Sequence, residues 1–300
     1  MLFSAAPISR PTTRIQGMKV AIAQLEPILG DVPANLEKHL ARIDEAVRQQ
    51  AKFILFPELS LTGYHLQDMV ADVAQEADRS GPLRQLRERS RDISIVAGFV
   101  EQSPGIRFFN SAAFFERGEI VHIHRKVYLP TYGMFDEGRD FGSGETFRAF
   151  PTDQGRMGIL TCEDLWHTSS AFLLTQDGAE IILIPSNSPI KGVGAEEELA
   201  SQTTWLELAR TTARFQTVFL LYGNRVGCEE GIQFGGGSFA LDPNGRILAR
   251  STSRKEGLLF AELDPELLRE ARTCYPLVRD EKLDLVYREL GRIRKRKFNL

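Results

Sequence analysis

The stretch FILFPELSLTGY, residues 53–64, decides the fold class of this chain. It opens with a continuous apolar run, Phe53–Phe56, that ends at Pro57, as expected for a β-strand buried on both faces. Strand and helix patterns alternate on either side of it. They are a strand at Lys19–Gln24, a helical period at Ala34–Gln49, a helix at Leu83–Arg91 and a strand at Ile93–Phe99. This β-α-β-α-β order predicts a layered α/β fold.

The remainder of the core predicts mostly strands, joined by short turns. The expected strands are Ser111–Glu116, Glu119–His124, Arg156–Thr161, Glu180–Pro185, Thr217–Tyr222, Gly237–Leu241, Arg246–Arg250 and Gly257–Leu263. The expected helices are Leu165–Asp177 and Glu196–Phe215. Arg117–Gly118 predicts a tight hairpin connection, and DPNG at 242–245 predicts a second turn.

The composition is that of a globular protein without a strong charge bias. The 300 residues are 42% hydrophobic and 26% charged, with a formal net charge of −3. This balance predicts neither nucleic acid nor a membrane surface as a partner. No apolar run approaches the roughly 18 residues that a membrane span needs.

Three cysteines, Cys162, Cys228 and Cys274, lie far apart and form no CxxC pair. An odd and sparse set argues against a disulfide framework and against a structural zinc site. We therefore expect a reducing, cytoplasmic location and no metal. In that setting a reduced cysteine is free to act as a nucleophile.

Both ends of the chain differ from its middle. Residues 1–17 have two arginines but no acidic residue and no secretory apolar core, so we expect a disordered leader, with Met18 as an alternative start. Residues 269–300 form a charged C-terminal tail that includes the basic run RIRKRKF at 292–298. A short basic run without an aromatic platform predicts a solvated or assembly surface, not nucleic-acid binding.

Three polar residues follow predicted strands, where α/β folds place their sites. Glu58 comes after the buried strand and Pro57, and a carboxylate in such partly apolar surroundings suits a general base. Lys126 is a cation that could stabilise charge developing on a substrate oxygen. Cys162 precedes a helical pattern, whose dipole would favour the thiolate. Each also has a structural reading: an ion-pair partner, a surface lysine and a buried cysteine.

Other catalytic motifs are missing from the sequence. The segment FGGGSFA at 234–240 lacks the second glycine of a GxSxG nucleophile elbow. None of the five histidines has HExxH-type metal spacing, and His167, five residues after Cys162, would point away from it on a helix. No P-loop is present, so ATP use is not predicted.

Glu58, Lys126 and Cys162 each lie within a distinctive segment of the chain. The segments are MKVAIAQLEPILGDVPANL, FPELSLTGY, HRKVYLP, LTCEDLWHTS, IPSNSP, ARTTARFQTVFLLYGNRVG and FGGGSFALDPNGRIL. Together they resemble the nitrilase superfamily of carbon–nitrogen hydrolases, which uses a Glu-Lys-Cys triad. The resemblance implies a four-layer αββα sandwich and a hydrolase domain over residues 18–268. It also implies a homodimer or higher homo-oligomer, with the tail at the interface or the surface.

The same resemblance implies roles for the site residues. Cys162 would attack the amide carbon while Glu58 takes its proton, and Lys126 with a backbone amide would hold the oxyanion. Ammonia would leave from a cysteine thioester intermediate. Glu137 matches a further family glutamate that positions the substrate, and no metal or organic cofactor is implied. Pocket selectivity is expected from Tyr132, Phe135, Glu163, Trp166 and Ser188.

The segments YLPTYGMFDEGRDF and CEDLW are most similar to the glutaminase domain of glutamine-dependent NAD synthetases. Two departures argue against glutamine as the substrate. The chain ends without an ATP-binding synthetase domain, and Gly194 stands where those glutaminases have an arginine, although Ser188 matches their serine. We therefore expect a free-standing amidase that acts on a small-molecule amide. The alternatives are a nitrilase, an N-carbamoyl amine hydrolase, or an ammonia-supplying glutaminase-like subunit of a separate synthetase.

Overall fold

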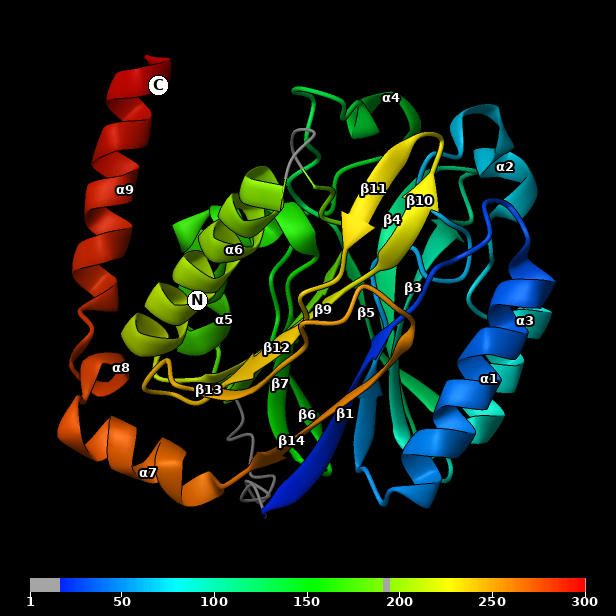
Figure 1. The fold of residues 1–300 in the computed structure, drawn as a ribbon. Helices are drawn as coiled ribbons and strands as arrows, with labels where there is room; N and C mark the ends of the chain where they lie inside the picture. The colour runs from blue at the N-terminus through cyan, green and yellow to red at the C-terminus, as the bar shows by residue number, and fades with distance from the viewer. Residues whose placement is uncertain (1–16, 191–194, 300) are drawn as a thin grey trace.

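Two six-stranded β-sheets face each other in this protein, and helices cover their outer faces (Figure 1). We describe them from a computed structural model, which covers residues 17–190 and 195–299. The expected leader, apart from Gly17, and the predicted departure at Gly194 lie outside these residues. Within them, every helix is too short or too polar to cross a membrane.

The first sheet has the strand order β14-β1-β2-β3-β4-β5. Its strands are β1 (Met18–Gln24), β2 (Phe53–Leu55), β3 (Ser94–Gln102), β4 (Phe108–Glu116), β5 (Glu119–Arg125) and β14 (Gly257–Leu263). Strands β1, β2 and β3 are parallel, while the other pairings are antiparallel. The β4–β5 hairpin turns at Arg117 and Gly118, whose φ angles of 53° and 83° confirm the predicted tight connection.

The second sheet has the strand order β13-β12-β9-β8-β7-β6. Its strands are β6 (Phe150–Thr152), β7 (Gly155–Ile159), β8 (Ile181–Ser186), β9 (Phe219–Asn224), β12 (Phe239–Leu241) and β13 (Ile247–Arg250). Strands β7, β8 and β9 are parallel. The residues that follow them therefore meet at one edge of the sheet.

Helices lie over the outer face of each sheet (Figure 1). Helices α1 (Val32–Arg48) and α3 (Gly81–Arg89) cover the first, and α5 (Thr168–Gln176) and α6 (Ala195–Gln216) cover the second. Helix α1 begins where Asp31 accepts a hydrogen bond from Ala34 N at 3.0 Å, and Ser80 caps α3 in the same way. A proline in the first turn of both helices favours the same start points.

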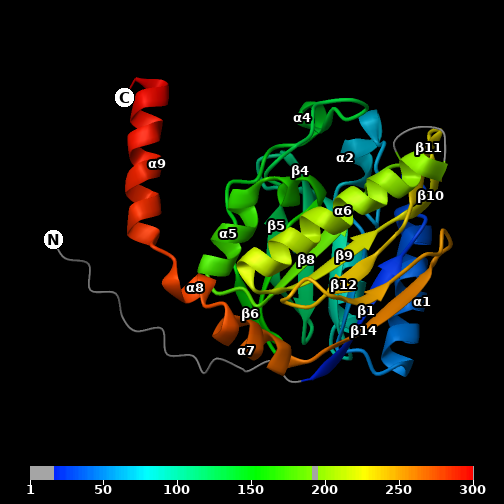
Figure 2. The ribbon, with the colours of Figure 1, turned by 60° about the vertical axis from the view of Figure 1, so that its left-hand side comes forward.

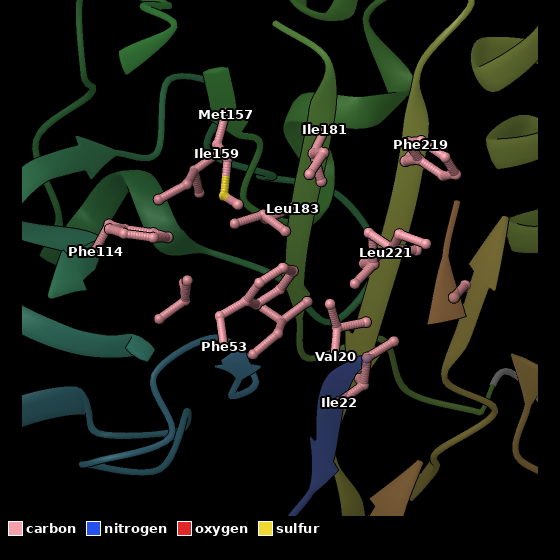
Figure 3. Close-up of a cluster of buried hydrophobic side chains, with 14 of the residues drawn as sticks. Val20, Ile22, Phe53, Phe114, Met157, Ile159, Ile181, Leu183, Phe219 and Leu221 are labelled. Atoms are coloured by element: carbon pink, nitrogen blue, oxygen red, sulfur yellow. The ribbon is translucent and has the colours of Figure 1, made fainter. Parts of the chain in front are cut away.

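Three layers of apolar side chains separate the four layers of secondary structure. The middle layer joins the sheets, and its members include Val20, Phe53, Phe114, Ile159, Leu183 and Leu221 (Figure 3). Neighbouring residues on the same strands point outwards instead, so Ile54 packs toward α1 and α3, and Ile182 toward α5 and α6. Both sheets are thus buried on two faces, which confirms the predicted αββα sandwich.

Short elements connect the layers. They are η1 (Gln67–Met69), α2 (Val70–Val73), α4 (Glu137–Asp140), η2 (Cys162–Trp166), and the hairpin of β10 (Val226–Glu229) with β11 (Ile232–Gly235). The hairpin was not predicted, because strands of four residues are too short to show a period. The expected helix over Leu165–Asp177 is wrong in its first part. His167, with φ −100° and ψ 108°, separates η2 from α5.

The charged C-terminal region is helical, with α7 (Pro265–Cys274), α8 (Leu277–Asp280) and α9 (Leu283–Phe298). Helix α7 packs against the body through buried Leu268 and Ala271. The expected domain boundary after residue 268 lies inside this helix. Helix α9 stands away from the body and buries none of its residues (Figure 2).

Candidate active site

The turn that carries Glu58 lies directly against strand β3. Leu61 N donates to Gly98 O at 3.1 Å, and a Cβ added to Gly98 would lie 2.3 Å from Leu59 N. Only glycine leaves room for so close an approach of two backbones. The turn therefore folds back over the end of the sheet, and the Glu58 side chain is buried beneath it.

Both carboxylate oxygens of Glu58 accept hydrogen bonds from buried donors. Oε1 accepts from Asn110 Nδ2 and from Lys126 Nζ, each at 2.8 Å. Oε2 accepts from Asn187 N at 2.8 Å, and Asn187 Nδ2 donates to the Glu58 carbonyl. Asn110 lies on β4 and Lys126 follows β5 of the first sheet, whereas Asn187 follows β8 of the second. The Glu58 carboxylate thus connects the two sheets at one end of the sandwich.

Lys126 is the centre of a buried charge cluster. Its Nζ donates to Glu58 Oε1 at 2.8 Å and to Glu137 Oε1 at 2.6 Å, and the side chain is 1% exposed. Tyr64 joins the cluster because its hydroxyl donates to Glu137 Oε1 at 2.5 Å. Among the described residues, Glu137 Oε2 has no hydrogen-bond partner although it is buried. One cation, Lys126, therefore pairs with two carboxylates, and Glu137 Oε2 can still accept a hydrogen bond from a ligand.

The cluster shifts the pKa values of its members. Burial raises the pKa of Glu137 to about 7, with Lys126 opposing the rise. Burial by itself would lower the pKa of Lys126, but the carboxylates of Glu137 and Glu58 raise it well above its usual value. Burial and the charge of Glu137 likewise raise the pKa of Tyr64. Near neutral pH, Lys126 is a cation and Tyr64 a hydroxyl donor, while Glu137 is poised between its two protonation states.

Cys162 lies where the segment after β7 turns into η2. Its φ of 47° is in the left-handed region, which redirects the backbone at the edge of the sheet. Ser186, the last residue of β8, donates through Oγ to Cys162 Sγ at 3.2 Å. Burial raises the pKa of the Cys162 thiol well above its usual value; the charge of Glu58 adds to this effect and that of Lys126 opposes it.

The expectation of a thiolate at a helix N-terminus is therefore wrong. Helix η2 is a 3₁₀ turn of only five residues, too short for an appreciable dipole, and burial dominates. Cys162 is a protonated thiol at neutral pH, so a base must take its proton when it reacts. Glu58 is the charged group with the largest effect on that thiol.

The residues expected to set selectivity share one cavity with Cys162. Its wall includes Tyr132, Phe135, Glu163, Trp166, Ser188 and Trp205. The Tyr132 hydroxyl donates to Glu163 Oε2 at 2.8 Å, and Trp205 Nε1 donates to Ser188 Oγ at 2.6 Å. Glu163 is the only charged side chain among the described residues of this wall. The cavity is therefore aromatic, with one carboxylate.

Four polar residues in contact with this cluster were not predicted as site residues: Tyr64, Asn110, Ser186 and Asn187. Three of them lie inside the quoted motifs FPELSLTGY and IPSNSP. Their nearness to Glu58 and Ser188 in the chain could have identified them as site residues. Asn110 offered none, because it precedes the strand expected from Ser111 and no motif includes it.

The arrangement has the parts that acyl transfer needs: a thiol, a carboxylate able to take a proton, and a fixed cation. A metal site is a different matter. Within residues 17–190 and 195–299, no three His, Cys, Asp or Glu side chains are grouped so that they could hold a metal ion. The catalytic roles of Glu58, Lys126 and Cys162 stay predictions at this point.

Comparison with known proteins identifies relatives of two kinds. A glutamine-dependent NAD(+) synthetase of Acinetobacter baylyi is 32% identical over 252 residues, which cover 84% of this chain and 45% of the synthetase. An (R)-stereoselective amidase of a Pseudomonas species is 31% identical over 270 residues, which cover 89% of this chain and 93% of the amidase. The chain thus spans less than half of that synthetase but nearly all of the amidase.

The fold and the sequence point to the same family. The crystal structure of a carbon–nitrogen hydrolase from Helicobacter pylori superposes with a TM-score of 0.82 at 26% identity, covering 92% of this chain and 98% of that one. The carbon–nitrogen hydrolase family itself matches residues 19–273. The chain is therefore a carbon–nitrogen hydrolase and belongs to the nitrilase superfamily, as its motifs predicted.

Proposed function

We propose that this protein is an amidase that releases ammonia from a small amide through a thioester on Cys162. One observation carries the proposal: a half-buried thiol, that of Cys162, lies within the electrostatic reach of a carboxylate and a cation that are hydrogen-bonded to each other, Glu58 and Lys126. Similarity to the Pseudomonas amidase over nearly its whole length supports it.

In the proposed reaction, Cys162 Sγ attacks the amide carbon while Glu58 takes the thiol proton. The carbonyl oxygen becomes an oxyanion, which the Lys126 ammonium stabilises. The C–N bond then breaks, and the nitrogen leaves as ammonia with the proton from Glu58. Water gives a proton back to Glu58 and attacks the thioester, which releases the acid and restores the thiol. Glu137 Oε2, which lacks a hydrogen-bond partner among the described residues, would accept a hydrogen bond from the substrate.

We further propose that the substrate bears a protonated amine. Glu163 brings a carboxylate to the cavity wall, and the rings of Phe135, Trp166 and Trp205 surround a space that favours a cation. No arginine or lysine lines this cavity among the described residues. A substrate carboxylate would therefore lose its hydration there without gaining a partner.

A matched panel of amides tests the function and the substrate charge together. We expect ammonia release from 4-aminobutanamide with a kcat/KM about fivefold above that of pentanamide, since one partly exposed ion pair contributes about 1 kcal/mol. Glutaramate, which has a carboxylate in the same place, should be hydrolysed more slowly still. The Glu163→Gln variant should lose the preference for the amine but keep its activity on pentanamide. Equal rates on all three amides would refute the charge preference, and no ammonia from any of them would refute the amidase.

A glutaminase-like subunit that supplies ammonia to a separate synthetase is the second candidate. The identity of 32% to the NAD synthetase over 84% of this chain favours it. Glutamine has both an amine and a carboxylate, so adding it to the panel separates the candidates. Hydrolysis of glutamine well above that of 4-aminobutanamide would favour the subunit.

Helix α9 supports a proposal about assembly. Leu283, Tyr287 and Leu290 follow a helical period and are 47%, 81% and 60% exposed, so the residues that the structure describes leave one apolar side of the helix uncovered. Helices α5 and α6 likewise expose Leu173 and Phe215. Both surfaces belong to the same chain, so a two-fold pair of chains can cover each with the other. We propose that α9 packs on α5 and α6 of a second copy in a homodimer.

Two variants with a new glutamate on opposite sides of α9 test this assembly. Light scattering should give the wild-type chain a mass of twice 33.7 kDa. Leu290→Glu places a charge in the apolar side and should give a monomer at micromolar concentration. Arg288→Glu, on the charged side, should leave the dimer intact. A wild-type monomer, or identical masses for the two variants, would contradict the proposed interface.

A further inference from the structure

Asp164 is a fully buried carboxylate that contacts the segment carrying Lys126. Its Oδ1 accepts hydrogen bonds from Val127 N at 3.1 Å and from Tyr128 N at 3.0 Å. These two amides follow Lys126 directly, at the point where the chain leaves β5 and has no further strand partner. Asp164 therefore fixes the backbone next to the ammonium-bearing residue.

The other oxygen of the same carboxylate contacts the segment carrying Cys162. Oδ2 accepts from Thr161 N, the residue before Cys162, at 3.0 Å. It also accepts from His124 Nε2 at 2.8 Å, two residues before Lys126. One buried side chain thus holds the backbone after Lys126, the His124 ring before it, and the backbone of the residue that leads into Cys162.

We infer that Asp164 is a positioning residue, which sets the Cys162 sulfur against the Lys126 ammonium by tying their backbones together. The inference rests on the proposed roles of Cys162 and Lys126. Asp164 itself lies two residues after the nucleophile and contacts neither reacting group. It acts through the backbone, and so it is distinct from the residues that perform the chemistry.

The backbone conformation at Cys162 explains why the hydrogen bond from Thr161 N to Asp164 matters. A φ of 47° is unfavourable for a residue with a side chain and persists only where neighbouring contacts hold it. The Thr161 bond to Asp164 restrains the residue immediately before this turn. A ring contact joins the same two segments again, because Tyr128 stacks on His167 with centroids 3.4 Å apart. Without Asp164, Cys162 is free to relax away from the attack geometry.

The Asp164→Asn variant tests the inference, because it keeps the shape but replaces an acceptor by an amide donor that faces N–H groups. We expect kcat to fall about 100-fold with KM changed less than threefold, since misplacement by about 1 Å costs a factor of that size. The rate constant for alkylation of Cys162 by iodoacetamide, followed by mass spectrometry, should fall at least tenfold. That readout needs no substrate, so it stands even if the proposed amidase activity fails.

Asp177→Asn is the matched control, since Asp177 Oδ2 accepts from Ala149 N at 2.7 Å far from the thiol. It should lower the melting temperature without slowing alkylation. If Asp164→Asn fails to fold, His124→Leu decides instead: it removes one of the four donors and should slow alkylation about threefold. Wild-type alkylation rates in a folded Asp164→Asn, or in His124→Leu where only that variant folds, would overturn the inference.

Discussion

Replacing Cys162 by alanine should lower kcat for the best amide by at least about four orders of magnitude, the scale seen when a catalytic nucleophile is removed. The expected loss is this large because the other two cysteines, Cys228 and Cys274, are exposed and contact no part of the charge cluster described above. The measurement is ammonia release under saturating substrate, with KM determined in parallel.

Cys228→Ala is the matched control for this experiment and should keep wild-type kcat. Hydroxylamine added during turnover provides an independent readout, since it attacks a thioester and yields a hydroxamate. The hydroxamate should form with the wild-type protein and with Cys228→Ala but not with Cys162→Ala. Full activity in Cys162→Ala would show that the thiol is not the nucleophile, and the proposed mechanism would be wrong.

The fold was predictable from the sequence because each layer leaves a local signal. Strands buried on two faces read as apolar runs, as Phe53–Leu55 does, and the helices over them show an apolar period, as Val32–Arg48 does. Helix α9 was missed although its apolar residues Leu283, Tyr287 and Leu290 have helical spacing. The density of charge around them led us to expect a solvated tail.

The site was only partly predictable, because the protonation state of a side chain depends on how deeply the fold buries it. The order of Glu58, Lys126 and Cys162 was visible in the sequence, and the structure brings Glu58 and Lys126 into contact at 2.8 Å. The protonation of Cys162 was predicted wrongly, since neither its burial nor the short length of η2 can be read from spacing. The link that Asp164 makes between two distant segments is a property of the folded chain alone.

Lys126→Met should disable the enzyme and also make its stability depend strongly on pH. Activity should fall at least about 10³-fold, because the cation opposite the oxyanion is lost. Breaking a buried ion pair costs about 3–5 kcal/mol of unfolding free energy. We expect that loss at pH 8, measured by urea denaturation. Lys52→Met, at an exposed lysine, should leave both activity and stability unchanged.

The loss of unfolding free energy in Lys126→Met should be smaller at pH 5 than at pH 8. The reason is the protonation of Glu137. Burial already raises its pKa to about 7 against a usual 4.5, and removing Lys126 takes away the charge that opposes this rise. At Glu137 the folded variant then binds more proton than the unfolded chain does, so the contribution of this group to stability is fully present below about pH 4.5 and is lost as pH rises through 7 and above. Adding Glu137→Gln to Lys126→Met removes the carboxylate and should restore part of the stability at pH 8, but little at pH 5. A deficit of equal size at both pH values would show that lost packing, not an uncompensated buried carboxylate, destabilises the variant.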